Sequence, residues 1–224
     1  MLDPHDDFPN LFVLDHPLVA DKLTSMREHD TGRRAFRALV EQIAGLMVYE
    51  ATRTLPTRPI RVHTPLEETE GVRLAGSPTV VPVLRAGLGL AAGVLDMLPN
   101  ARVGHIGVSR DEETLRPIEY LSKLPDDLDA GPVLLLDPML ATGGSASFAA
   151  RVLREAGAKD LRMLCIVAAP DGVRRMLRDH PEMPIYAASL DRELDGHGFI
   201  RPGLGDAGDR LFGTGVRDRT DEIH

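Results

Sequence analysis

The chain has 224 residues, of which 43% are hydrophobic, and this predicts one compact domain with short terminal extensions. Its formal net charge of −8 argues against nucleic acid or an anionic membrane as a partner held by bulk electrostatics. The one cysteine, Cys165, excludes an internal disulfide framework, and we expect a soluble cytoplasmic protein because no apolar run approaches the roughly twenty residues that span a bilayer.

The first part of the chain predicts helices followed by a hairpin. Apolar residues recur at helical spacing over residues 16–30 and again over 31–55, with Asp30 or Thr31 as the N-cap of the second helix. We therefore expect two amphipathic helices before any strand. In residues 56–76 short β-prone segments alternate with proline and glycine, a pattern typical of a surface hairpin.

From residue 79 onward, short apolar runs alternate with segments of helical period. The expected strands are residues 79–84, 101–109, 132–137, 161–169 and 184–190, and the clearest helical segments are 89–98 and 145–157. This alternation predicts an α/β fold with a mostly parallel central sheet flanked by helices. The polar stretch 109–128 predicts a mobile flap with a strand near "IEYLSK", and we expect residues 216–224 to be frayed.

Ligands of open parallel sheets bind beyond the carboxyl ends of the strands, and the first strand end of interest carries Arg85. Gly87, Gly89 and Ala92 follow it and match the G-x-G-x-x-A dinucleotide pattern, with the acid Asp111 about twenty residues further on. One hypothesis is therefore an NAD(P)-dependent oxidoreductase. About eighty residues precede the motif, however, whereas such a motif usually follows the first strand of its unit.

The second strand end is "VLLLDPMLATGGSA", residues 133–146, in which Asp137 follows a buried strand. Thr142, Gly143, Gly144 and Ser145 then form a loop whose backbone N–H groups can converge on an anion at a helix N-terminus. The loop lacks the lysine of a Walker A motif. An acid for vicinal hydroxyls beside amides for a phosphate predicts a site for a ribose 5-phosphate.

The third segment is "GFIRPGLGDAGDRLFGT", residues 198–214, which is too rich in glycine for a helix. Its glycines, Gly203, Gly205 and Gly208 among them, allow the backbone to approach a flat ligand closely. Backbone N–H and C=O groups can hydrogen-bond to an imide edge. A simple cluster of turns is the alternative interpretation.

Four segments in order along the chain carry a resemblance to a known family. They are "VLRAGLG", "SRDEETLRP", "DPMLATGG" and "PGLGDAGDRLFGT", joined near the start by "HPLV", "SMREHDT" and "YEATRTLP". Together, from roughly His16 to Thr214, they resemble uracil phosphoribosyltransferases. The resemblance implies the type I phosphoribosyltransferase fold, as a single domain over residues 1–224. Its expected parts are N-terminal helices (1–55), a hairpin excursion (56–78), a core (79–190) and a C-terminal hood segment (191–215).

The implied reaction joins uracil to 5-phospho-α-D-ribose 1-diphosphate (PRPP), giving uridine monophosphate and pyrophosphate, so that residues 79–190 bind PRPP and 191–215 bind uracil. By resemblance, the catalytic residues are Arg85, Arg110, Asp137 and Asp206. The same resemblance assigns PRPP binding to these four and to Pro138, Met139, Leu140, Ala141, Thr142, Gly143, Gly144 and Ser145. It assigns uracil to Ile200, Gly205, Asp206 and Ala207. Uptake of the uracil N1 proton by Asp206 is a hypothesis.

Two positions need comment. Pro138 stands where the wider family has a second acid, as in the uracil-specific branch, and Phe199 stands where a tyrosine is expected, so that a hydroxyl contact is absent. The metal implied is Mg²⁺, which we expect to arrive on the substrate diphosphate and not in an all-protein cage. The eight histidines have no ligand-like spacing.

Oligomeric state and regulation come from the resemblance, which implies a homodimer or higher homo-oligomer and leaves GTP open as an allosteric activator. A non-catalytic PRPP-sensing regulator is the remaining alternative. It predicts a degraded base-binding segment or an added basic surface, and the sequence has neither.

Overall fold

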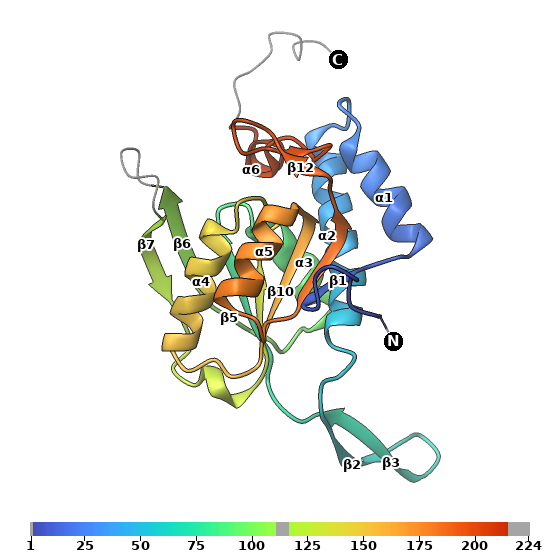
Figure 1. The fold of residues 1–224 in the computed structure, drawn as a ribbon. Helices are drawn as coiled ribbons and strands as arrows, with labels where there is room; N and C mark the ends of the chain where they lie inside the picture. Colours follow the sequence, from blue (N-terminus) through green and yellow to red (C-terminus); the bar gives the residue numbers. More distant parts are fainter. Residues whose placement is uncertain (1, 111–116, 215–224) are drawn as a thin grey trace.

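The structure is a computed structural model that describes residues 2–110 and 117–214. Within these residues the central sheet has nine strands, and its main path runs β1-β11-β10-β8-β4-β6-β7, with β5 beside β4 and β9 beside β10 (Figure 1). The strands are β1 (Leu11–Val13), β4 (Thr79–Leu84), β5 (Arg102–Val103), β6 (His105–Arg110), β7 (Pro117–Lys123), β8 (Val133–Leu136), β9 (Met139–Leu140), β10 (Leu161–Ala168) and β11 (Ile185–Leu190). Every pairing is parallel except that of β6 with β7.

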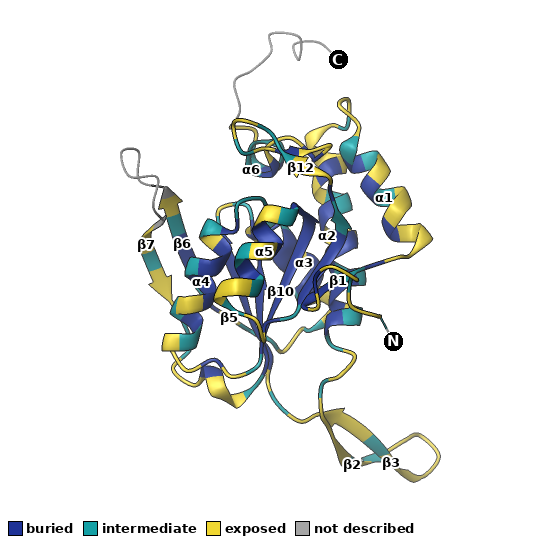
Figure 2. Ribbon diagram, in the orientation of Figure 1, coloured by how far each residue is buried: buried dark blue, intermediate teal, exposed yellow. Residues whose placement is uncertain are grey.

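Helices cover both faces of this sheet (Figure 1). One face packs against α1 (Pro17–Arg27), α2 (Arg33–Ala51) and α3 (Leu88–Met97), and the other against α4 (Gly144–Glu155) and α5 (Pro170–Asp179). Strand β8 shows why its sequence is continuously apolar, because Leu134 and Leu136 belong to the first core and Val133 and Leu135 to the second. The central strands are accordingly buried throughout (Figure 2).

The predicted α/β architecture is confirmed. All five expected strand runs contain strands, the strand near "IEYLSK" is β7, and the expected helices are present. Residues 111–116 of the expected flap and residues 216–224 lie outside the described residues. In the described part, none of the helices is long and apolar enough to cross a bilayer.

Two expectations at the N-terminus are wrong. A strand does precede the helices, because the three residues of β1 pair with β11 at the edge of the sheet. A sequence pattern of three residues is too short to predict such a long-range pairing. The N-cap of α2 is Gly32, not Asp30 or Thr31. The Thr31 hydroxyl instead donates to the Ser25 carbonyl at 2.5 Å and so ties the loop back to α1.

The predicted hairpin is formed by β2 (Thr57–His63) and β3 (Glu68–Leu74), which project from the body of the molecule (Figure 1). Most of its residues are exposed, including Leu66 and Val72. A 3-10 turn (Leu128–Ala130) precedes β8. The remaining elements, β12 (Glu193–Leu194), β13 (Ile200–Arg201) and α6 (Ala207–Phe212), form the hood segment, residues 191–214 as described here.

Close packing accounts for the glycines that matched a dinucleotide motif. A Cβ on Gly87 would lie 2.3 Å from the Leu136 carbonyl oxygen, and one on Gly89 would lie 2.7 Å from a methyl carbon of Leu211. Gly87 is therefore needed for the close backbone packing of the start of α3 on β8, and Gly89 lies against the Leu211 side chain of α6. The acid of the same motif, Asp111, lies outside the described residues.

Candidate functional site

A pocket of about 310 Å³ opens beyond the carboxyl ends of β4 and β8, under the hood segment. Its lining residues come from the two strand ends and from the hood: Arg85, Ala86, Asp137, Met139, Ala141, Gly198, Phe199, Ile200, Gly205, Asp206, Ala207 and Gly208. A larger cavity, about 630 Å³, lies at the opposite end of the strands, near the amino ends of β10 and β11. We assign the site to the smaller pocket, because ligands of parallel sheets bind beyond the carboxyl ends.

Asp137 is held at the end of β8 by the strand beside it. Its amide donates to the Leu164 carbonyl at 3.2 Å, and its Oδ1 accepts from the Met139 amide at 3.3 Å. Burial raises the pKa of Asp137 to about 7, and the Met139 hydrogen bond opposes that rise. Asp137 nevertheless lines the pocket and is only partly buried by surface area, so a ligand can reach this desolvated acid.

The loop after Asp137 is fixed by backbone hydrogen bonds and one left-handed glycine. The Pro138 carbonyl accepts from the amides of Ile166 and Val167 at 3.0 and 3.1 Å. Gly143 has φ of +73° and precedes the first residue of α4, and a Cβ there would lie 2.9 Å from the Gly172 carbonyl oxygen. No side chain caps α4 in the described structure, so its first amides point toward the loop without intrahelical acceptors.

Arg85 follows β4 and is exposed at the rim of the pocket, joined to Leu84 by a cis peptide bond. Its neighbour Gly87 packs against the Leu136 carbonyl oxygen, so the loops that carry Arg85 and Asp137 are in direct contact. Arg110 ends β6, a strand that pairs with β4, but its side chain lies outside the described residues.

The hood segment contributes mainly backbone to the pocket. The Ile200 side chain is buried in the core, 4% exposed. Gly205 has φ of +72° and an open Cβ position, whose nearest neighbour is Arg210 Cδ at 3.8 Å. Asp206 caps α6 through its Oδ1, which accepts from the Asp209 amide at 2.9 Å. A Cβ on Gly198 would come within 4.0 Å of Thr142 Cγ2, which places the hood next to the loop that follows Asp137.

The pocket brings together eight of the predicted site residues: Arg85, Asp137, Met139, Ala141, Ile200, Gly205, Asp206 and Ala207. Six more predicted residues lie in the segment after Asp137 but are not among the residues that line the pocket: Pro138, Leu140, Thr142, Gly143, Gly144 and Ser145. Ala86, Gly198, Phe199 and Gly208 line the pocket without having been assigned to it. Ala86, Phe199 and Gly208 adjoin assigned residues, and Gly198, Phe199 and Gly208 belong to the glycine-rich segment 198–214 that the sequence had already singled out.

Within residues 2–110 and 117–214, no three His, Cys, Asp or Glu side chains gather into a metal cage. The acids that do line the pocket are Asp137 and Asp206. Carboxylate oxygens are suitable ligands for Mg²⁺, which commonly takes one or two of them and completes its shell with water and substrate phosphates. These residues therefore fit an ion that brings most of its ligands with it.

Solved structures place this architecture among the phosphoribosyltransferases of type I fold. A hypoxanthine-guanine phosphoribosyltransferase from Bacillus anthracis, 12% identical, superposes with a TM-score of 0.50 over 71% of this chain and 80% of that chain, a likeness of fold alone. The AQ2163 protein from Aquifex aeolicus, 36% identical, superposes with a TM-score of 0.87 over 92% of this chain and 100% of that chain.

Sequence comparison identifies the family. The uracil phosphoribosyltransferase family model matches residues 13–214. Proteins named uracil phosphoribosyltransferase from Thermoanaerobacter sp. (strain X514) and Listeria innocua are 51% and 52% identical, each aligned over 92% of this chain and 99% of the relative. The chain belongs to the uracil phosphoribosyltransferase family.

The raised pKa of Asp137 gives a stability prediction. Between the ordinary value of 3.8 and about 7 the folded protein keeps a proton that the unfolded chain releases, so stability falls as pH rises through this window. Asp137→Asn removes that loss, and we expect its Tm to exceed that of the parent by at least about 2 °C at pH 8 and by much less at pH 4. Thermal denaturation across this range measures the difference.

Asp195→Asn is the control of opposite sign. Hydrogen bonds, first from the Phe199 amide and then from Arg201 and the His197 amide, lower the pKa of Asp195. Its ionised form therefore favours folding above the ordinary pKa, and the substitution should not raise the Tm at pH 8. Equal Tm values for the parent and Asp137→Asn at pH 8 would contradict the desolvation of Asp137.

Proposed function

We propose that this enzyme transfers the 5-phosphoribosyl group of PRPP to uracil, with the pocket residues above in the roles described next. The observation that carries the proposal is one pocket lined by Asp137 at a strand end and by the glycine-rich backbone of residues 198–208. Family membership over residues 13–214 supports it. In this division of the chain, residues 79–190 bind PRPP and the hood segment binds the base.

The PRPP half of the mechanism uses charge and backbone amides. The Asp137 carboxylate accepts hydrogen bonds from the ribose hydroxyls, and the amides at the start of α4 bind the 5-phosphate. Arg85 and Arg110 bind the diphosphate, because the guanidinium fork matches phosphate oxygens and stabilises the charge that develops as the leaving group departs. The contact between the Arg85 and Asp137 loops keeps these two binding groups in a fixed relation.

The base half uses the backbone of residues 200–207. With its side chain buried in the core, Ile200 presents main-chain groups to uracil, as do Gly205 and Ala207. Oδ1 of Asp206 is engaged by the Asp209 amide, which leaves Oδ2 for the substrate and for uptake of the uracil N1 proton. Asp137 and Asp206 are the carboxylates that would hold a Mg²⁺ ion carried by the diphosphate, and such an ion would neutralise part of the diphosphate charge.

Assembly and regulation form part of the same proposal. Exposed apolar residues on the hairpin, Leu66 and Val72, support a homodimer or higher homo-oligomer. Activation by GTP would be seen as faster uracil-dependent release of pyrophosphate when GTP is added. The single, buried Cys165 accords with a cytoplasmic location. Neither alternative is supported, because packing explains the glycine motif and the base-binding segment is intact.

The assignment is tested by uracil-dependent release of pyrophosphate from PRPP. We expect release with the parent protein and a loss of turnover of roughly a hundredfold or more in Asp137→Asn, since one acid serves both ribose hydroxyls. Folding of the variant is checked by the denaturation experiment above. Absence of uracil-dependent release from the parent protein would refute the function.

Arg85→Ala tests the diphosphate role. The variant should bind PRPP about 10-fold to 150-fold more weakly, the equivalent of a charge-assisted hydrogen bond, and ribose 5-phosphate almost unchanged. Titration calorimetry with both ligands measures this difference. Arg61→Ala, an exposed arginine on the hairpin, is the matched control. Equal losses for the two ligands in Arg85→Ala would exclude a diphosphate contact.

Base selection tests the backbone contacts. Cytosine presents a donor where uracil has the O4 acceptor and lacks the N3–H, and two unpaired buried partners imply roughly 30-fold to 10⁴-fold discrimination. We therefore expect cytosine to be a very poor substrate for the parent and for Ile200→Val. Gly205→Val should abolish uracil use, because φ of +72° disfavours valine and the new side chain adjoins the pocket.

Gly196→Val is the control for that substitution, since Gly196 lies in the same hood with an open Cβ position and no positive φ. Steady-state kinetics with both bases measure the outcome. Cytosine use within a few-fold of uracil by the parent would overturn backbone recognition while leaving phosphoribosyl transfer intact.

A further inference from the structure

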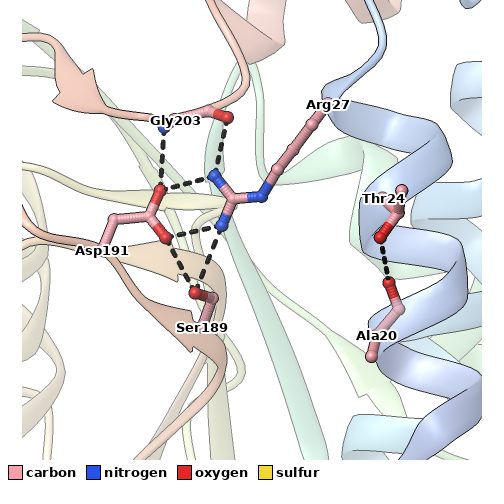
Figure 3. A network of polar contacts seen from close by, with 6 residues as sticks. All are labelled: Ala20, Thr24, Arg27, Ser189, Asp191 and Gly203. Atoms are coloured by element: carbon pink, nitrogen blue, oxygen red, sulfur yellow. Dashed lines mark hydrogen bonds and ion pairs between the residues drawn. The ribbon is translucent and has the colours of Figure 1, made fainter.

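A buried carboxylate behind the pocket receives four hydrogen bonds (Figure 3). The Asp191 side chain, 2% exposed, accepts from both terminal nitrogens of Arg27, at 2.6 and 2.8 Å. It also accepts from the Ser189 hydroxyl at 2.7 Å and from the Gly203 amide at 2.8 Å. Arg27 is the last residue of α1, whereas Asp191 directly follows β11. The pair therefore joins the N-terminal helix to the sheet and the hood.

The same network fixes both polar backbone groups of Gly203. Its amide donates to Asp191, and its carbonyl accepts from Arg27 at 3.0 Å (Figure 3). Gly203 has φ of +65°, and a Cβ there would lie 2.1 Å from the Ile200 carbonyl oxygen, so the chain turns tightly at this point. The pocket-lining residues Ile200 and Gly205 lie on either side of the turn.

A second arginine holds the next residue of the turn. Arg210 of α6 donates to the Leu204 carbonyl at 2.9 Å and to the Glu28 carbonyl, just beyond α1, at 2.9 Å. Its guanidinium carbon lies 4.1 Å from the centroid of the Phe36 ring. Residues 203 and 204 are thus attached to the end of α1 by two guanidinium groups.

We propose that Arg27, held by Asp191, is a positioning residue for uracil: through Gly203 it sets the backbone of residues 200–207 in the arrangement that binds the base. This inference rests on the proposed function and adds to it a residue that does not line the pocket. The PRPP-binding loop after Asp137 is attached instead to β10, through Ile166 and Val167. Of the residues assigned to PRPP, only Asp206 lies on the backbone that Arg27 positions. Loss of the Arg27 contacts should therefore weaken uracil binding much more than PRPP binding.

The electrostatics explain why an arginine is used here. Burial alone would raise the pKa of Asp191, but hydrogen bonds from Arg27, Ser189 and Gly203 outweigh it and the pKa is lowered. The carboxylate is thus ionised and needs a cation beside it. Lysine could supply the charge but not the two parallel donors together with the bond to the Gly203 carbonyl.

Steady-state kinetics of Arg27→Met and Arg27→Lys test the proposal. We expect KM for uracil to rise at least about tenfold in Arg27→Met and by an intermediate factor in Arg27→Lys, with KM for PRPP changing less than about twofold. A purely structural role would lower the Tm without separating the two KM values. If Arg27→Met does not fold, Arg27→Lys decides by the same criterion.

Arg162→Met is the matched control. Arg162, near the amino end of β10, also makes a two-point pair, with Asp160 at 2.9 and 2.8 Å, although the Asp160 side chain is more exposed than that of Asp191. Arg162 also donates to the Ala51 carbonyl at the end of α2. The Arg162→Met substitution should lower the Tm and leave KM for uracil unchanged. The proposal is overturned if the Arg27 variants keep the parent KM for uracil, if both KM values rise together, or if Arg162→Met raises KM for uracil equally. A parent protein without uracil-dependent activity refutes the proposed function itself, and this inference with it.

Discussion

Burial of the central strands on both faces is the constraint on which the rest of the molecule depends. Strand β8 contributes four residues with no exposed surface, two to each core. Such strands are apolar over most of their length, so the polar side chains that can meet a ligand lie at the strand ends. Asp137 occupies one of these ends, and the surroundings that fix its position also desolvate its carboxyl group and raise its pKa. Stability and reactivity are therefore opposed at this residue.

The second half of the site has a different construction. The hood contains only two short strands and a six-residue helix, too little to form a core of its own. Its order comes from attachment: Ile200, Leu204 and Leu211 pack into the core shared with α1–α3, and Arg27 and Arg210 hold the turn between them. The loop after Asp137 is held by hydrogen bonds to the sheet, whereas the hood backbone is held by two arginines and a buried acid.

The sequence predicted the sheet and both strand-end loops because their signals are local. Five apolar runs, a strand-end acid and a cluster of glycines each lie within a few residues. It did not predict β1, because the three residues of this strand are defined only by their pairing with the distant β11. It also did not predict that Gly32 is the N-cap of α2, because the Thr31 hydroxyl donates to the Ser25 carbonyl. The Arg27–Asp191 pair was beyond reach for the same reason, since 164 positions separate the partners. Gly87 and Gly89 are the opposite case: they form a local pattern that resembles a dinucleotide motif, but packing explains their presence.

The attachment of the hood to α1 has a consequence for the order in which the protein is made. The contact between Arg27 and the Gly203 carbonyl spans 176 positions, and those of Arg210 with the end of α1 span more than 180. During translation, β4, β8 and β10 emerge from the ribosome before the hood segment. The residues of the Asp137 loop are therefore synthesised before Gly203 and Arg210, which contact the end of α1. Premature termination near residue 190 would remove the whole hood segment and with it Asp191 and Gly203, the partners of Arg27 at the end of α1.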